Sequence, residues 1–131
     1  MKTQMEKINT EIILKAIKES DYKLIPTHNK LCLPIINRIY KKMINGIKFD
    51  DIKTCDSCII DGHHRFISSL LAKIKIDEGK SSKNSATSEY KWKDVDFVKE
   101  EWDTPQKIKR LNELDAEFNN IPIEKIIEFA K

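Results

Sequence analysis

Five consecutive residues, Asp61 to Arg65, have the side chains and the setting of an anion-binding site. They follow a short apolar stretch and precede apolar residues at helical spacing, so we expect them at a strand-to-helix junction. Gly62 permits a tight turn there. The N–H groups of Gly62, His63 and His64 would lie at the positive end of the helix dipole, and the Arg65 guanidinium can form two hydrogen bonds to one phosphate. The pattern therefore predicts a phosphate-binding loop.

Asp61 adds a chemical function to this loop. A carboxylate beside a bound phosphate repels it unless it binds a metal ion or accepts a proton. We therefore expect Asp61 to act as a base or metal ligand, with His63 and His64 as further catalytic candidates. Taken singly, Asp61 could be a helix cap, Gly62 a turn residue, and the histidines surface or core residues without a functional role. The concentration of two of the three histidines at one junction favours a functional site.

The elements that must position this junction follow from the spacing of apolar residues and from turn residues. Before the junction, the sequence predicts a helix over Met5 to Glu19, a strand over Tyr22 to Ile25, a loop through Thr27, His28 and Asn29, and a helix from about Leu33 to Asn45-Gly46. Two strands follow, Phe49 to Thr54 and Cys58 to Ile60, joined at Cys55-Asp56-Ser57. After the junction, it predicts a helix through Phe66 to Ile74, a strand over Tyr90 to Val98, a helix after Thr104-Pro105 and a short helix from about Pro122. The polar stretch Glu78 to Glu89 has little to bury and is predicted to be a mobile loop, which could cover a ligand as a lid or serve only as a connector. Trp92 and Trp102 are predicted to be core aromatics.

The block from Ile59 to Phe66, placed after a hairpin, resembles the ParB/sulfiredoxin-like superfamily, and within it the branch that contains free-serine kinases. The likeness covers roughly Tyr22 to Ile76. It implies a nucleotide phosphate bound at Gly62 to Arg65, and it implies that Asp61 participates in phosphoryl transfer. The stretch from Glu101 to Pro105 is similar to modules with the same loop at the ends of bacterial polymorphic toxins.

Two departures from the family limit what the resemblance implies. The kinases usually place a Glu before the helix that begins here near Leu33, whereas this chain has Thr27, His28 and Asn29. Sulfiredoxins place a Cys within the phosphate loop, where this chain has two histidines. We therefore expect neither serine phosphorylation nor sulfinic acid reduction.

Taken with the resemblance, the sequence predicts an α/β (α+β) fold of the ParB/sulfiredoxin-like type, a small mixed sheet with surrounding helices. One domain would span 1–131, with a core over 22–76, the mobile loop over 78–89, and a C-terminal strand and helices over 90–131. The expected ligand is a nucleoside di- or triphosphate, or another phosphorylated ligand, with Mg²⁺. The expected activity is that of a phosphotransferase or nucleotide hydrolase.

Positive charge supports an alternative function. The net charge is only +3, but six cations and no acidic residue lie between Tyr22 and Phe49. They form a solvated helix face or a track for a nucleic-acid backbone. Lys30, Arg38, Lys41 and Lys42 would form that track in a nuclease-type toxin domain acting on DNA or RNA, which would have an immunity protein as partner. A second alternative is a regulatory module that binds nucleotide without chemistry.

Cysteine content and hydropathy indicate the cellular compartment that we expect. Cys55 and Cys58 flank a two-residue turn like half of a zinc knuckle, but a second such pair is missing, so zinc is the weaker interpretation. An odd number of cysteines argues against a disulfide framework. No apolar run is long enough for a membrane span, and the first residues lack a secretory signal. We expect a cytoplasmic protein with no membrane partner, or one delivered as part of a larger toxin.

Overall fold

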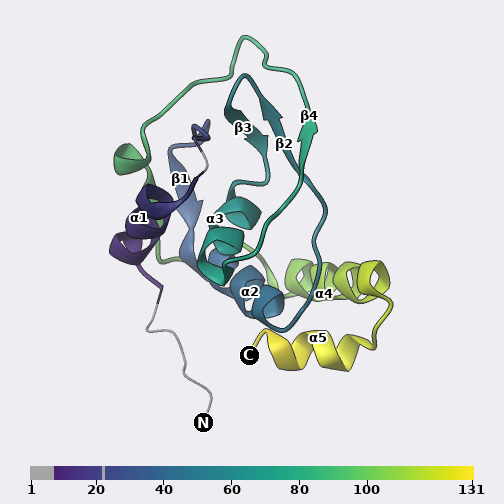
Figure 1. Cartoon of the computed structure of the whole chain (residues 1–131). Helices are drawn as coiled ribbons and strands as arrows, with labels where there is room; N and C mark the ends of the chain where they lie inside the picture. The colour runs from purple at the N-terminus through teal and green to yellow at the C-terminus, as the bar shows by residue number, and fades with distance from the viewer. Residues whose placement is uncertain (1–7, 22) are drawn as a thin grey trace.

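Two small β-sheets and the helices around them make up the fold (Figure 1). The structure is a computed structural model that describes residues 8–21 and 23–131. Its elements are α1 (Thr10–Glu19), β1 (Lys30–Cys32), α2 (Leu33–Ile44), β2 (Ile52–Cys55), β3 (Cys58–Asp61), α3 (His63–Ala72), β4 (Glu78–Lys80), the 3-10 helix η1 (Trp92–Asp94), β5 (Asp96–Val98), α4 (Pro105–Asn119) and α5 (Ile123–Phe129). The predicted mixed α/β fold is confirmed.

The larger sheet has the strand order β3-β2-β4. Strands β2 and β3 are antiparallel, and β4 runs parallel to β2. Asp56 and Ser57 in the connecting turn both have positive φ, 49° and 68°, as a two-residue hairpin with the favoured twist requires. The predicted hairpin is confirmed, although β2 begins at Ile52 rather than Phe49.

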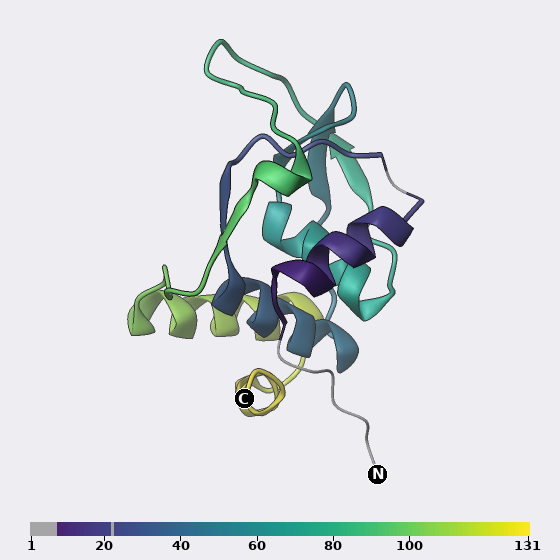
Figure 2. The same cartoon turned by 90° about the vertical axis from the view of Figure 1, so that its left-hand side faces the viewer.

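Helix α3 runs through the centre of the core and packs mainly against α2, with α1 on another side (Figures 1 and 2). Phe66 and Ile67 of α3 are almost fully buried. Pro34 stands in the first turn of α2, and Gly46, with φ +88°, follows the helix C-cap. These local signals confirm the predicted helix. Because α3 packs against α2 and α1, its first residues belong to a firmly held helix.

A strand that was not predicted from the sequence lies directly before α2 and pairs with a strand of the C-terminal half. Residues Lys30–Cys32 form β1, which pairs in parallel with β5, as Figure 2 shows along the left edge. The predicted strand over Tyr90 to Val98 is correct only in its last part, because η1 occupies Trp92–Asp94. Of the predicted strand ending at Ile25, only Ile25 forms a bridge, to Cys58. Tyr22 and the start of the predicted first helix lie outside the described residues.

Two further predictions are corrected by packing. The first three residues of the predicted loop, Glu78–Lys80, form β4, because their backbone pairs with β2. Trp92 lies beside Phe66 and donates from its indole N–H to the Leu24 carbonyl, but Trp102 is exposed and is not a core residue.

In Figure 1 the C-terminal helix α4 lies to the right of α2, and α5 lies below α4. The predicted Thr104 cap is confirmed, since its hydroxyl accepts from the Lys107 N–H at 3.1 Å. Ile47, Ala116 and Ile126 form a small buried cluster between these helices and the rest of the molecule. Within the described part of the chain, none of the helices is long and apolar enough to cross a membrane.

Candidate functional site

The junction between β3 and α3 leaves the first amides of the helix without protein partners. Gly62 is the N-cap, in the left-handed region with φ +95°, and it supplies no side-chain cap. The first helical hydrogen bond runs from the Phe66 N–H to the Gly62 carbonyl at 2.9 Å. The N–H groups of His63, His64 and Arg65 make no hydrogen bond to any residue that the structure describes. Three donors are thus available at the positive end of α3.

Glycine is required at position 62 for two reasons. An L-residue is strained at φ +95°, and a Cβ atom here would lie 2.7 Å from Cγ2 of Ile52 and 2.8 Å from an Arg65 guanidinium nitrogen. Both distances are shorter than van der Waals contact. A side chain at position 62 would therefore have to displace Ile52 or the Arg65 guanidinium.

The His63 side chain is buried and binds the backbone of Thr27. It is 2% exposed, and its Nε2 accepts the Thr27 N–H at 3.0 Å, so the ring proton belongs on Nδ1. That Nδ1 is buried and has no hydrogen-bond partner among the described residues. His28 stacks on the ring with centroids 4.2 Å apart. Burial, followed by repulsion from His28 and His64, lowers the pKa of His63 to about 3.

His64 makes the equivalent contact one residue later. Its Nε2 accepts the Cys32 N–H at 2.9 Å, and the edge of the Trp102 ring system lies near it, with centroids 5.6 Å apart. Burial is the main cause that lowers the pKa of His64 to about 4, and the charge of His28 lowers it further. Both imidazoles are therefore neutral at neutral pH. Their side chains hold the segment from Thr27 to Cys32 against α3, and their backbone N–H groups remain to bind an anion.

Asp61 and Arg65 are the charged side chains at the mouth of the junction. The Asp61 side chain is 71% exposed, and its carboxylate lies 3.6 Å from Nη2 of Arg65. The same Nη2 donates to the Asp51 carbonyl at 3.0 Å. Arg65 is thus held in place while its charge remains beside the open amides. No sequence pattern signals the Asp51 carbonyl or the two amides that the histidines accept from, since these contacts join segments that are far apart in the sequence.

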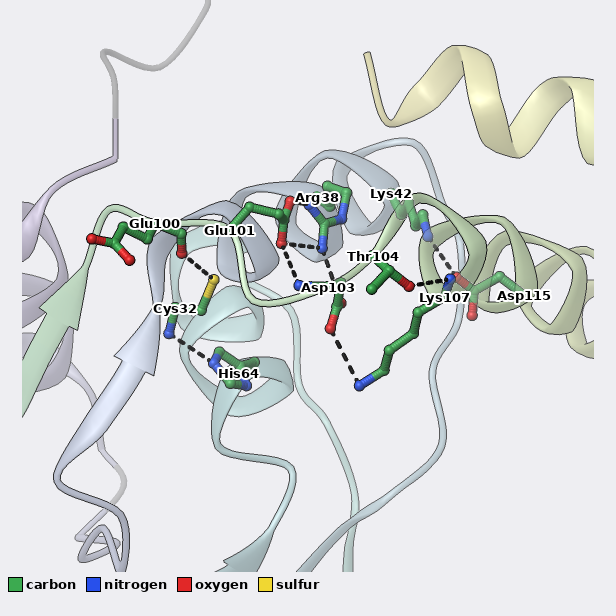
Figure 3. A network of polar contacts seen from close by, with 10 residues as sticks. All are labelled: Cys32, Arg38, Lys42, His64, Glu100, Glu101, Asp103, Thr104, Lys107 and Asp115. Atoms are coloured by element: carbon green, nitrogen blue, oxygen red, sulfur yellow. Dashed lines mark hydrogen bonds and ion pairs between the residues drawn. The ribbon is translucent and has the colours of Figure 1, made fainter.

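Two cations of the basic segment are paired with carboxylates of the same chain (Figure 3). Arg38 pairs with Glu101 and, at 3.1 Å, with Asp103. Lys42 is buried and lies 2.7 Å from Asp115. Arg38 and Lys42 are therefore paired with carboxylates of the C-terminal part of the chain, which weakens the support for the predicted nucleic-acid track. Of the four predicted cations, Lys30 is exposed and Lys41 is half-buried.

The cysteines do not gather into one cluster. Cys55 and Cys58 face each other across the hairpin, whereas the Cys32 thiol donates to the Glu100 carbonyl at 3.2 Å. Among residues 8–21 and 23–131, no group of three or more His, Cys, Asp or Glu side chains has the arrangement of a metal site.

The loop after β4 is anchored away from the junction. Lys83 in this loop lies 3.9 Å from Asp56 and 3.3 Å from Glu89. Asp56 is in the hairpin turn, at the opposite end of β3 from Asp61 and Gly62. Figure 1 shows the loop rising above this turn. The contacts favour the connector interpretation over a lid on the phosphate loop.

The chain has no match in comparisons with protein-family models, curated proteins and solved structures. The resemblance to the ParB/sulfiredoxin-like superfamily therefore stays a prediction that rests on the motif around Asp61 to Arg65.

Proposed function

We propose that the junction between β3 and α3 binds the phosphate groups of a small phosphorylated molecule, with a nucleoside di- or triphosphate as the expected ligand. The observation that carries this proposal is the set of three unpaired amides at the start of α3. Free N–H groups at a helix N-terminus, aligned with the helix dipole, are the usual protein ligands of a phosphate.

Three neighbouring features support an anion rather than water at these amides. The Arg65 guanidinium is fixed by the Asp51 carbonyl and adds positive charge beside the loop. The glycine at position 62 leaves no side chain between the backbone and a ligand. The buried Nδ1–H of His63 is one more donor without an acceptor. A site with this many unmet donors favours a ligand with several acceptor oxygens.

Asp61 gives this site a route to chemistry. A hydroxyl or water that attacks the terminal phosphorus would transfer its proton to the Asp61 carboxylate, while the bond from phosphorus to the leaving oxygen breaks. One exposed carboxylate beside a phosphate site also fits Mg²⁺, which is usually bound through one or two carboxylates together with substrate phosphates. The ion would arrive with the nucleotide and neutralise part of its charge.

The nucleic-acid alternative loses its main support because Arg38 and Lys42 are paired within the molecule.

A regulatory module without chemistry differs from the proposed enzyme only in the role of Asp61. Asp61→Asn separates these two: it should retain or strengthen nucleotide binding and slow turnover about 10²-fold, the range that one positioned base contributes. Unchanged turnover in this variant would reduce Asp61 to a structural residue.

Binding itself is tested by thermal denaturation with a panel of nucleotides, with and without Mg²⁺. A ligand present at about 100 times its dissociation constant stabilises the folded state by about 2.7 kcal/mol. We expect such stabilisation for the wild type and for Lys30→Ala, which removes an exposed cation outside the junction, and a much smaller effect for Arg65→Lys. Equal responses of the wild type and Arg65→Lys, or no response to any nucleotide, would contradict the proposal.

A further inference from the structure

A groove lies between α2 and α4. Its volume is about 550 Å³, within the range of small-molecule sites. Arg65 lines the groove and also stands in the phosphate loop, so the two places share one side chain. The walls are mainly apolar, with Ile39 from α2, Phe49 from the following loop and Leu111 from α4.

Asn112, one of the polar residues that line this groove, has an unmet hydrogen-bond group. Asn112 of α4 is 7% exposed and lines the groove, and its amide oxygen is buried without a hydrogen bond to any described residue. Buried carboxamides are nearly always hydrogen-bonded. The last torsion angle of asparagine is broad, so rotation presents either its oxygen or its NH₂ group to a ligand. The neighbouring Lys42 and Asp115 are bonded to each other and do not supply the missing contact.

Arg65, which also lines the groove, has an unmet group of its own. Its Nη2 is used by Asp51 and Asp61, but its Nε is buried and has no partner in the described part of the chain. The residues that line the groove therefore include two unpaired polar atoms, Nε of Arg65 on α3 and Oδ1 of Asn112 on α4. Two unmet polar groups between apolar walls point to one bound molecule that has both flat apolar faces and a polar edge.

We infer that this groove binds the base of a nucleotide whose phosphates occupy the start of α3. A nucleobase has apolar faces that fit between Ile39, Phe49 and Leu111, and an edge with donors and acceptors that pairs with an asparagine amide. An aliphatic ligand would cover Asn112 and leave it unpaired. The inference rests on the proposed phosphate site, because Arg65 connects the two.

The test compares nucleotides with inorganic tripolyphosphate, which has the phosphates but no base. Calorimetric titration of the wild type with ATP, GTP, CTP and UTP should find at least one nucleotide that binds about 10-fold or more tightly than tripolyphosphate. Asn112→Ala and Leu111→Ala should remove most of this preference and leave the affinity for tripolyphosphate unchanged. Leu111 is partly exposed, so its truncation is a second variant with little risk to folding. Asn37→Ala, on α2 and outside the lining of the groove, is the matched control and should keep the preference.

Each other outcome has a distinct meaning. Equal binding of tripolyphosphate and every nucleotide by the wild type would overturn the base site while leaving the phosphate site intact. Failure of all these ligands to bind would overturn the phosphate site, and the base site with it. A preference for a nucleotide that survives in Asn112→Ala and Leu111→Ala would place the base elsewhere. Self-association lost in Leu111→Ala, with nucleotide affinity unchanged, would assign the groove to a second copy of the chain.

Discussion

Two clusters of polar residues lie close together in this molecule and differ in how fully their hydrogen bonds are used. At the interface between α2 and α4, Arg38 and Lys42 each contact carboxylates from the C-terminal part of the chain. At the start of α3, three amides and the Nδ1 of His63 have no partner among the described residues. The more strongly charged region is thus the better satisfied one.

This contrast shows why the density of positive charge is a poor guide to a binding site here. A cation that meets a largely buried carboxylate within its own chain, as Arg38 and Lys42 do, is neutralised before any ligand arrives, and its removal lowers the stability of the fold. Arg65 differs because the carboxylate beside it, Asp61, is exposed. An unpaired amide holds no net charge, yet it binds an anion without breaking an existing contact. The predictions below separate these two kinds of region, starting with the largest expected effect.

Removal of the Lys42 side chain should destabilise the fold without changing ligand binding. Lys42→Ala leaves Asp115 without its partner at a largely buried position, which should lower the free energy of unfolding by about 3 kcal/mol. Lys15→Ala breaks an exposed pair with Glu19 and should cost less than about 0.5 kcal/mol. Chemical denaturation measures both. A stable Lys42→Ala variant with weakened phosphate or nucleic-acid binding would return Lys42 to a ligand-binding track.

The two glycines with positive φ provide a matched pair for the phosphate loop. Gly62→Ala combines backbone strain with a close contact to Ile52, so the free energy of unfolding should fall by about 2.5 kcal/mol and nucleotide binding should weaken. Gly46→Ala meets open space at a similar φ and should cost only about 1 kcal/mol, with binding unchanged. Equal effects of the two substitutions on stability and binding would argue against a tightly packed loop.

Acid should destabilise the junction through His63. Its pKa is lowered from 6.5 to about 3 in the folded state, so the unfolded chain takes up the proton first. The stabilising contribution is complete above pH 6.5 and is lost as the pH falls toward 3, and at pH 5 the loss should be about 2 kcal/mol. His63→Gln should remove this part of the pH dependence in unfolding experiments between pH 5 and 8. Identical pH profiles for the two proteins would mean that His63 is not buried as a neutral ring.

Local signals in the sequence were sufficient for much of the fold. Pro34 and Gly46 delimit α2, Asp56 and Ser57 turn the hairpin, and Thr104 caps α4, because each of these features depends on neighbouring residues. The position of the candidate loop at a strand-to-helix junction was predicted for the same reason.

Contacts between distant segments were not predictable in this way. Strand β1 has only three residues and exists because it pairs with β5, near the other end of the chain. His63 and His64 look like ligands of phosphate in the sequence, but in the fold burial keeps both rings neutral and they accept the N–H groups of Thr27 and Cys32. Nothing near Arg38 or Lys42 in the sequence reveals that acidic residues of the C-terminal part of the chain neutralise them.

The most direct test of the central claim is a titration of the ¹⁵N-labelled protein with tripolyphosphate, followed by amide chemical shifts. The unpaired N–H groups at the start of α3 should respond most, so the largest saturable changes are expected at His63, His64 and Arg65, with little change at Lys30 and Lys41. Changes centred on Lys30 and Lys41, or no saturable change at the start of α3, would contradict the assignment of this junction as the phosphate site.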